Sequence, residues 1–390
     1  MINLTRLYLN APQPADGLRY GLGHERPFVT AAVRKPVVVW NITRRCNLRC
    51  IHCYSDSEPR EYPGELSLEE CRGVIEDLAE FGIPALLLSG GEPLTHPNFY
   101  EIARMAAGRG LRLTLSTNGT LLRRAAALSL REIGFSYVGI SLDGIGAVHD
   151  EFRGRRGAFE QAVRAFRNCR EVGQKVGLRL TLTSHNVDNL PAILDFIERE
   201  EIERVCFYHL VFSGRGAGLQ LVSPERVRRA LDQILDRLLA WESRGTRREV
   251  LTVDQPADAV YVYLRLSRED PAKAERLLEL MQWNGGGANS SGVGIANIDS
   301  SGNVHPDQFW QSYTLGNVRQ KSFSEIWTKS EDELLRGLRE RIPRLRGRCA
   351  SCRFVRICGG GFRIRAAQVH NDPWAEDPGC YLRDEEILTA

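Results

Sequence analysis

The chain reads Trp40-Asn-Ile-Thr-Arg-Arg-Cys46-Asn-Leu-Arg-Cys50-Ile-His-Cys53-Tyr54 directly after an apolar run of three valines. Three thiols at this spacing suit an iron–sulfur cluster or zinc, because soft thiolates bind these metals well. A structural zinc site is closed by four protein ligands, and no fourth cysteine or separate histidine follows at finger-like spacing. Cys46, Cys50 and Cys53 therefore predict a 4Fe–4S cluster that is held by three cysteines and keeps one iron open for an exchangeable ligand.

The composition is that of a globular protein. The chain has 390 residues, of which 43% are hydrophobic and 26% charged. Its net charge of +3 gives no argument for a nucleic-acid partner. The first residues lack the apolar region of a secretion signal, and no apolar stretch reaches the length of a membrane span. With ten cysteines, these features predict a soluble cytoplasmic protein that uses its thiols for metal or redox chemistry rather than disulfides.

Apolar strand-like runs alternate with amphipathic helical patterns from residue 37 onward. The predicted strands are Val37–Ile42, Ala85–Leu88, Leu111–Ser116, Tyr137–Ile140, Leu178–Thr183 and Arg204–Leu210. The predicted helices between them are Leu68–Phe81, Tyr100–Ala107, Leu121–Ile133, Phe159–Val172 and Leu190–Glu200. This alternation predicts an α/β fold whose parallel sheet is curled by right-handed crossovers into an incomplete (β/α)6 TIM-like barrel. Sites in such barrels lie at the C-terminal ends of the strands, and the cysteine loop follows the first strand.

We expect four regions along the chain. Residues 1–35 are rich in Pro, Gly and Arg and form an irregular N-terminal arm, and residues 36–212 form the barrel. Residues 213–283 form a helical linker region, because Pro224–Trp241 and Asp258–Met281 have helical patterns. A Gly- and Asn-rich stretch then opens a C-terminal domain, residues 284–390, with a short strand pair near Gly294–Ile298 and Gly302–Val304 and a cysteine-rich end.

A second motif, Leu88-Ser-Gly90-Gly91-Glu92-Pro, ends the second predicted strand. Its glycines permit a close backbone approach to a ligand, and Glu92 offers a carboxylate that can accept from an ammonium group. Together with the cysteine loop one β/α unit earlier, this stretch resembles the radical S-adenosylmethionine (radical SAM) enzymes. The resemblance implies that the three cysteines bind the cluster, that S-adenosylmethionine chelates its open iron, and that Gly90, Gly91 and Glu92 bind the methionine amino group.

The same resemblance implies four further contacts with the cofactor. Ser116 and Asn118 end the third predicted strand with polar groups that suit a ribose. Asp143 belongs to a Ser-x-Asp-Gly stretch after the fourth strand, and Arg179 is a cation on the fifth strand that suits the methionine carboxylate. The alternative for each is ordinary loop polarity or capping of a strand end. An unpaired arginine inside a barrel is costly, which favours a ligand role for Arg179.

The C-terminal region carries a second set of thiols, namely Cys349, Cys352, Cys358 and Cys380. Four thiols complete either a 4Fe–4S cluster or a zinc site, so the spacing alone leaves both open. The tail resembles the SPASM-type auxiliary-cluster extension of radical SAM proteins, which implies iron. It departs from that pattern at Asp307 and Phe362, where the extension has cysteines. We therefore expect one auxiliary cluster, and two 4Fe–4S clusters in the whole chain.

Several stretches resemble one subgroup, the radical SAM proteins of haem d1 biosynthesis. They are Thr43-Arg-Arg-Cys46-Asn-Leu, His209-Leu-Val-Phe-Ser213-Gly-Arg215, Gly302-Asn-Val-His305-Pro-Asp307 and Trp374-Ala-Glu-Asp-Pro-Gly-Cys380. The likeness spans residues 36–385. It implies an enzyme that generates a 5′-deoxyadenosyl radical and removes propionate side chains from the tetrapyrrole 12,18-didecarboxysirohaem. It also implies a reduced flavodoxin- or ferredoxin-type protein as electron donor.

Such a substrate needs cations for its carboxylates and a ligand for its iron. Arginines crowd the tail cysteines and are candidates for carboxylate binding, with a solvated basic face as the alternative. They are Arg336, Arg339, Arg341, Arg344, Arg346, Arg348, Arg363 and Arg365. His209 and His305 are candidate axial ligands of the substrate iron, and Asp307 is a third candidate catalytic residue. The alternative for each histidine is a hydrogen-bonded residue at a strand end.

Three other functions stay open from the sequence. The first is iron-coproporphyrin III synthesis, which uses the same cofactors but removes acetate side chains from didecarboxysirohaem. The second is peptide maturation by a SPASM-bearing enzyme, for which the 35 residues before the barrel are too few to form a leader-binding domain. The third is a zinc-stabilised binding protein without enzymatic activity.

Overall fold

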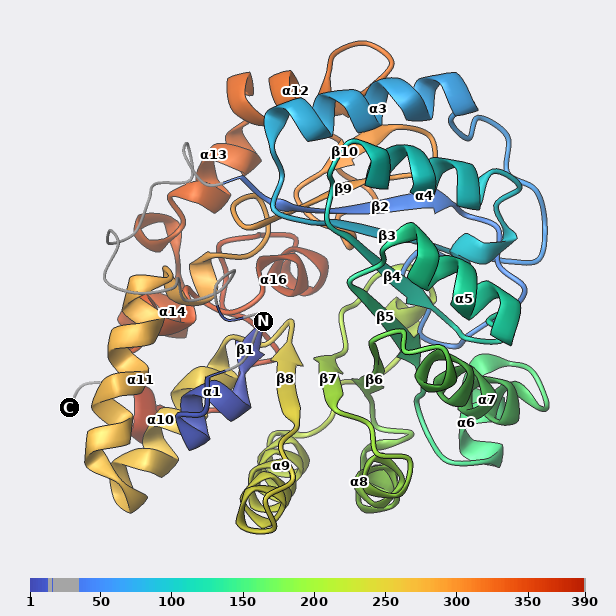
Figure 1. Ribbon diagram of the computed structural model, residues 1–390. Coiled ribbons are helices and arrows are strands. Elements are labelled where there is room, and N and C mark those ends of the chain that lie inside the picture. Colours follow the sequence, from blue (N-terminus) through green and yellow to red (C-terminus); the bar gives the residue numbers. More distant parts are fainter. Residues whose placement is uncertain (13–15, 17–34, 389–390) are drawn as a thin grey trace.

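One curved sheet runs through the molecule (Figure 1). The structure, a computed structural model, describes residues 1–12, 16 and 35–388. The sheet order is β1-β8-β7-β6-β5-β4-β3-β2-β9-β10-β11. Strands from β9 through β2 to β8 run parallel, and β1, β10 and β11 are antiparallel additions at the two edges.

The strands have the following bounds: β1 (Ile2–Asn3), β2 (Val37–Thr43), β3 (Leu86–Gly90), β4 (Leu113–Thr117), β5 (Tyr137–Ser141), β6 (Val176–Leu182), β7 (Arg204–His209), β8 (Glu249–Val253), β9 (Ile295–Ile298), β10 (Asn303–His305) and β11 (Gly316–Asn317). The six predicted strands correspond to β2–β7, so the predicted barrel is confirmed. Its sheet stays open between the β1 and β11 edges, and α16 lies on that open side (Figure 1).

Helices α3 to α9 cover the convex face of this sheet (Figure 1). The helices are α1 (Leu4–Leu9), α3 (Leu68–Phe81), α4 (Phe99–Gly108), α5 (Arg124–Ile133), α6 (Ala147–Arg153), α7 (Ala158–Glu171), α8 (Leu190–Arg199), α9 (Pro224–Ser243), α10 (Ala257–Glu269), α11 (Pro271–Trp283), α12 (Phe323–Lys329), α13 (Glu333–Arg339), α14 (Gly347–Ser351), α15 (Val355–Cys358), α16 (Arg363–His370) and α17 (Asp384–Ile387). Short 3₁₀ turns lie at Pro93–Thr95, Val187–Asn189, Gly214–Gly218, Gly286–Ala288 and Ile342–Arg344.

Local signals in the sequence set these elements. The α3 helix begins at a capping box, in which Ser67 and Glu70 satisfy each other's backbone N–H groups, and it ends at Gly82 in the left-handed conformation. Along β6, Leu178, Leu180 and Leu182 pack into the main core with the outer helices. Because strand side chains alternate between faces, Arg179 and Thr181 of β6 face the barrel interior instead. This alternation gives the interior its polar lining.

The expected region boundaries do not bound the sheet. Residues 213–283 were expected to be helical, but they also contain β8, which pairs in parallel with β7. The first strand of the tail, β9, pairs in parallel with β2 on the other side. The N-terminal arm is not wholly irregular, because β1 pairs with β8 and α1 follows it. The rest of that arm, residues 13–15 and 17–34, lies outside the described residues.

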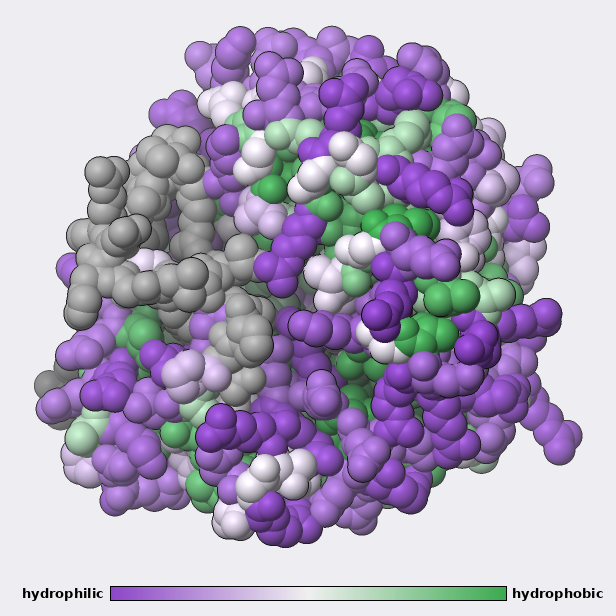
Figure 2. Space-filling view, viewed as in Figure 1, coloured by the Kyte–Doolittle hydropathy of each residue, from purple (hydrophilic) through white to green (hydrophobic). Residues whose placement is uncertain are grey.

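The surface in the orientation of Figure 1 is largely hydrophilic, and apolar side chains show mainly toward its middle (Figure 2). Across the part of the chain that the structure describes, no helix is long and apolar enough to cross a membrane.

Candidate functional site

The cysteine loop follows β2 at the C-terminal end of the parallel strands. Its three thiols lie together, and Cys46 and Cys50 are buried. Each sulfur accepts a hydrogen bond from a nearby N–H group: Cys46 Sγ from Leu48 at 3.4 Å, Cys50 Sγ from Arg153 at 3.5 Å and Cys53 Sγ from Ser57 at 3.5 Å. Such donors stabilise thiolates and tune cluster potentials, so the donor set fits an iron–sulfur cluster.

Burial of the cysteine loop favours the neutral form of its thiols. Burial raises the pKa of Cys46 to about 12, and burial also raises the pKa of Cys50. Metal ligation requires thiolates, and a bound cation is the group that makes such thiolates stable in a buried loop. The cysteines of this loop therefore become thiolates when they bind a metal.

Two glycines join the cysteine loop to the end of β3. A Cβ atom at Gly90 would lie 2.3 Å from the Thr43 carbonyl oxygen, and one at Gly91 would lie 2.3 Å from the Arg45 carbonyl oxygen. This closeness lets the Gly91 N–H donate to Thr43 at 2.8 Å and the Glu92 N–H donate to Arg45 at 2.9 Å. The glycines thus bring two backbone segments together, beside any role toward a ligand.

Glu92 is fully buried and ties the end of β3 to the end of β4. Its carboxylate accepts from the Asn118 N–H at 2.7 Å, from the Thr117 hydroxyl at 2.8 Å and from the Leu94 N–H at 3.2 Å. Burial raises the pKa of this carboxyl to about 7 despite the three donors. A carboxylate has about four acceptor positions, so about one stays available for an ammonium group.

Asn118 faces the cysteine loop, and Ser116 lies two residues earlier, on β4. The Asn118 amide donates to Asn47 Oδ1 at 2.9 Å and lies 3.9 Å from Cys46 Sγ. Ser116 is partly buried and pairs with Gly139 of β5. Contact of either residue with a ribose stays a prediction.

Asp143 supports the cysteine loop through Arg153. Its carboxylate is buried, pairs with the Arg153 guanidinium and accepts from the Thr181 N–H at 2.8 Å. Burial alone would raise the pKa of Asp143, but the charge of Arg153 together with the neighbouring histidines and the Thr181 N–H outweighs it, and the pKa is lowered. Arg153 in turn donates to Cys50 Sγ. The sequence shows Arg153 in the segment after the Ser-x-Asp-Gly stretch, but this role was not predicted from it.

Arg215 is a second residue that the sequence did not identify. It follows β7, and its guanidinium donates to the Cys50 carbonyl at 2.8 Å and to the Ser57 carbonyl at 2.9 Å. Its backbone N–H donates to the Cys53 carbonyl at 2.9 Å. The loop after β7 therefore holds the second and third cysteines of the triad and the segment after them.

Arg179 lies in the barrel interior with its guanidinium 4.8 Å from the centre of the Tyr208 ring. Among the described residues no carboxylate forms an ion pair with it. Its proposed partner, the methionine carboxylate, stays a prediction.

The four tail cysteines surround one small cavity that also borders Gln255 and Asp377. Burial raises the pKa of each thiol, whereas backbone N–H groups of Asp377, Phe354 and Leu382 lower the pKa of Cys349, Cys352 and Cys380 respectively. These N–H groups suit thiolate ligands. Within the described residues, no three His, Cys, Asp or Glu side chains are close enough to hold a single metal ion.

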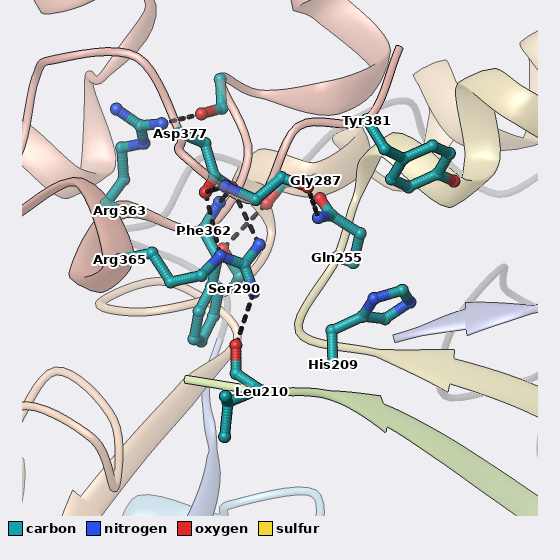
Figure 3. A network of polar contacts seen from close by, with 12 residues as sticks. His209, Leu210, Gln255, Gly287, Ser290, Phe362, Arg363, Arg365, Asp377 and Tyr381 are labelled. Atoms are coloured by element: carbon teal, nitrogen blue, oxygen red, sulfur yellow. Dashed lines mark hydrogen bonds and ion pairs between the residues drawn. The ribbon is translucent and has the colours of Figure 1, made fainter. Parts of the chain in front are cut away.

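A buried ion pair fixes the loop before Cys380 (Figure 3). Arg365 of α16 binds both oxygens of Asp377, at 2.9 and 2.8 Å, and its third nitrogen is 3.5 Å from the Leu210 carbonyl after β7. Asp377 also accepts from the Phe362 and Gly379 N–H groups. The pair therefore connects the barrel end to the auxiliary cysteines.

The expected substrate role of the tail arginines is wrong for the buried ones. Arg341, Arg363 and Arg365 are at most 1% exposed. Arg341 donates to Leu338, Ser290 and Ser291, and Arg363 donates to the carbonyls of Gly360, Pro373 and Ala375. Arg341 and Arg363 therefore hold loops of the tail mainly through backbone acceptors, whereas Arg365 pairs with the Asp377 carboxylate.

The structure separates the three candidate substrate residues. His305 is 1% exposed, and its ring nitrogens face the Tyr313 carbonyl at 2.7 Å and Asp299 at 3.4 Å. Both nitrogens therefore have partners within the tail, and a role of His305 as an iron ligand stays a prediction. Asp307 is fully buried against Ser291 and the Phe309 N–H, which assigns it to the interior of the tail. His209 borders a cavity of about 280 Å³ together with Cys380 and Tyr381, and its Nε2 faces Asp258 at 3.0 Å.

An incomplete parallel barrel with a three-cysteine loop at its C-terminal end and a second cysteine set beside it defines a radical SAM enzyme with an auxiliary-cluster domain. The chain belongs to the radical SAM superfamily: the profile of that superfamily matches residues 40–197, and that of the SPASM iron–sulfur cluster-binding domain matches residues 291–353. Membership in this family argues against a zinc-stabilised binding protein.

Three relatives with functional names are similar over most of the chain. A protein named Fe-coproporphyrin III synthase from Methanosarcina barkeri is 47% identical over 99% of this chain and 99% of its own length. A protein named pre-heme d1 synthase from Dinoroseobacter shibae is 46% identical over 93% of this chain and 90% of its own. An AdoMet-dependent heme synthase from Oleidesulfovibrio alaskensis is 34% identical over 88% and 86%.

Solved structures resemble the fold. The enzyme anSMEcpe with bound AdoMet superimposes with a TM-score of 0.71 at 19% identity, covering 88% of this chain and 93% of its own. SuiB from Streptococcus suis with S-adenosylmethionine gives a TM-score of 0.68 at 17% identity, covering 90% and 78%. At these identities the likeness shows the radical SAM fold with its C-terminal extension.

Proposed function

We propose that this chain is a radical SAM enzyme of haem d1 biosynthesis that removes propionate side chains from didecarboxysirohaem. The observation that carries the proposal is the joint placement of the three-cysteine loop and the Gly-Gly-Glu turn. They are hydrogen-bonded to each other at the barrel end that the four-cysteine tail covers. The relative named pre-heme d1 synthase supports the choice of reaction.

The residues present fit the cofactors that this function requires. Cys46, Cys50 and Cys53 would hold a 4Fe–4S cluster, and Gly90, Gly91, Glu92, Ser116, Asn118 and Asp143 are the proposed surroundings of S-adenosylmethionine, with Arg179 as a candidate for either the methionine carboxylate or a substrate carboxylate. When bound, the cluster and S-adenosylmethionine supply a 5′-deoxyadenosyl radical that abstracts hydrogen from substrate. The chain's own part is to position these groups: Arg215 and Arg153 hold the triad, and Glu92 connects two strand ends across from it.

The tail would hold a second 4Fe–4S cluster through Cys349, Cys352, Cys358 and Cys380. At four irons per cluster, about eight iron atoms per chain are expected after anaerobic reconstitution. Values near four or near twelve would contradict two clusters. We further propose a reduced flavodoxin- or ferredoxin-type electron donor and a cytoplasmic location, because ten cysteines suit a reducing compartment.

The second candidate function is Fe-coproporphyrin III synthesis, which the 47% identity over 99% of the chain favours. Anaerobic incubation of the reconstituted protein with dithionite, S-adenosylmethionine and didecarboxysirohaem separates the two. Mass spectrometry should show loss of propionate-derived mass if the first proposal is right. Loss of acetate-derived mass would replace it by the second, and absence of 5′-deoxyadenosine would overturn the enzyme class for this chain.

A further inference from the structure

Arg179 presents an unpaired cation to the barrel interior. The neighbouring leucines of β6 pack outward into the main core, so Arg179 points inward by strand alternation. Its side chain is partly exposed, and in the described parts of the chain its guanidinium has neither a hydrogen-bond acceptor nor a carboxylate partner. A cation withdrawn from bulk water without a partner is costly, so an anion that binds there would offset the cost.

The surroundings of Arg179 leave room for a long side chain, and no carboxylate of the described residues forms an ion pair with it. A Cβ atom at Gly139 of β5 would lie 2.5 Å from Arg179 Cδ, so only glycine at this position leaves room for the arginine. The groups that act electrostatically on it are the tyrosines Tyr208, Tyr137 and Tyr54 and the thiol of Cys206. Burial raises the pKa of Tyr208 and of Tyr137, which keeps both neutral at neutral pH.

Tyrosine hydroxyl groups near the guanidinium make its surroundings suitable for binding a carboxylate. The Tyr137 hydroxyl is buried and has no hydrogen-bond partner among the described residues. The Tyr54 hydroxyl belongs to the residue after Cys53 and donates to Asn41 Oδ1 at 3.0 Å on the inner face of β2. Within the described residues, the interior therefore combines a guanidinium that has no ion-pair partner with a hydroxyl that has no hydrogen-bond partner.

The position of Arg179 distinguishes it from the proposed cofactor contacts. Most of those contacts are joined by hydrogen bonds along β2, β3 and β4, as in the Gly91 to Thr43 and Asn118 to Glu92 contacts, whereas Asp143 follows β5 and accepts from the Thr181 N–H of β6. Arg179 lies on β6, separated from β3 by two strands, and it leans on Tyr208 of β7. The loop after β7 is the place where the tail contacts the barrel through Arg365 and Leu210. Arg179 therefore neighbours the strand whose following loop contacts the tail.

We infer that Arg179, Tyr208 and Tyr137 form a subsite in the barrel interior that binds a side-chain carboxylate of the substrate. The inference rests on the proposed function and deepens it, because a propionate-bearing tetrapyrrole would anchor one carboxylate there while another side chain lies near the cysteine loop. A guanidinium suits this ligand because its planar fork matches a carboxylate. The methionine carboxylate of S-adenosylmethionine has the same chemistry and is the other source of anion that the experiment must distinguish.

The test measures binding by the full reconstituted chain under anaerobic conditions. Coproporphyrin III, with four propionates, is titrated by fluorescence, and its tetramethyl ester serves as the probe without anions. The variants are Arg179→Gln and Arg179→Lys, with Arg112→Gln as the matched control, because the Arg112 side chain is exposed. S-adenosylmethionine affinity is measured separately by equilibrium dialysis.

Arg179→Gln should weaken coproporphyrin III binding about 10- to 100-fold, the range for a lost charged hydrogen bond. Arg179→Lys should bind coproporphyrin III with an affinity between those of wild type and Arg179→Gln. Arg112→Gln should bind it as tightly as wild type. The ester should bind weakly and equally to all variants. S-adenosylmethionine affinity should be unchanged, and the melting temperature of Arg179→Gln should stay level or rise, whereas a purely structural arginine would lower it.

Three results would overturn the inference. If Arg179→Gln loses S-adenosylmethionine affinity and keeps coproporphyrin III affinity, the subsite holds the methionine carboxylate. If both affinities are unchanged, Arg179 binds neither anion, while the proposed function still stands on its product assay. A wild-type chain that binds no carboxylated tetrapyrrole would instead overturn the proposed function together with the inference.

Discussion

Replacing Gly91 by alanine tests whether the close contact between the cysteine loop and the β3 turn holds the cofactor site together. The new Cβ atom would lie 2.3 Å from the Arg45 carbonyl oxygen and 2.6 Å from that of Arg44, although real Cβ contacts essentially never fall below 3.0 Å. The two backbone segments must therefore separate. The backbone conformation of Gly91 itself is open to alanine, so the effect is steric.

The magnitude follows from two contributions. Overpacking of this kind costs about 1–3 kcal/mol. Separation also weakens the hydrogen bonds of the Gly91 and Glu92 N–H groups, at about 1 kcal/mol each. We expect the free energy of unfolding of Gly91→Ala to fall by about 2–5 kcal/mol. Since the displaced segment carries the triad, iron after reconstitution should fall from about eight to about four atoms per chain.

The assay is chemical denaturation of the apoprotein, with iron determination on the reconstituted protein. Gly73→Ala is the matched control, because nothing lies within 4 Å of its Cβ position in α3. It should stabilise the chain by about 0.5–1 kcal/mol, as expected for glycine to alanine inside a helix. Equal stability and equal iron content in Gly91→Ala and Gly73→Ala would refute the reasoning.

Three other predictions concern buried charges. Arg153→Met leaves the Asp143 carboxylate buried and unpaired, so unfolding free energy should fall by about 3–5 kcal/mol. Adding Asp143→Asn should restore most of it, and additive losses in denaturation would contradict a direct pair. Asp377→Ala leaves Arg365 buried without its carboxylate partner. This variant should lose about four of about eight irons per chain, while S-adenosylmethionine binding, measured by dialysis, persists. Full iron content in the variant would contradict this prediction. Burial raises the pKa of the Asp307 carboxyl to about 6. Between about pH 4 and pH 6 the native state therefore holds a proton that the unfolded state has lost. The free energy of unfolding should fall as the pH rises through this range, by up to about 3 kcal/mol. Asp307→Asn should flatten that slope in denaturation, and an unchanged slope would show that another group titrates.

Much of the barrel could be predicted because its signals are local. The run Val37–Ile42 became β2, and the amphipathic pattern Leu68–Phe81 became α3 with the same bounds. In contrast, β8 was missed: Glu249–Val253 is five residues long and lies between two helices. Its strand character depends on pairing with β7, which the local sequence does not encode.

The candidate site was predictable only where residue type and spacing carry the chemistry. The two cysteine sets and the Gly-Gly-Glu turn could be recognised from the sequence because most residues of each motif lie a few positions apart in one segment. His305 was a reasonable ligand candidate from its strand-end position, yet the structure buries it between Tyr313 and Asp299. Whether a histidine is free or hydrogen-bonded depends on packing against distant residues.

The sequence by itself determined the chemistry that the chain can support. Three cysteines within eight residues and four more in the tail define two ligand sets, whatever their surroundings. Only the tertiary structure decided how these sets are held. Arg153 reaches Cys50 across 103 residues, and Arg215 reaches the same residue across 165. It also decided that Arg179 has no partner among the described residues while Arg365 pairs with Asp377. All of these arginines carry the same charge, so their roles depend on strand register and burial, which arise only when distant segments pack together.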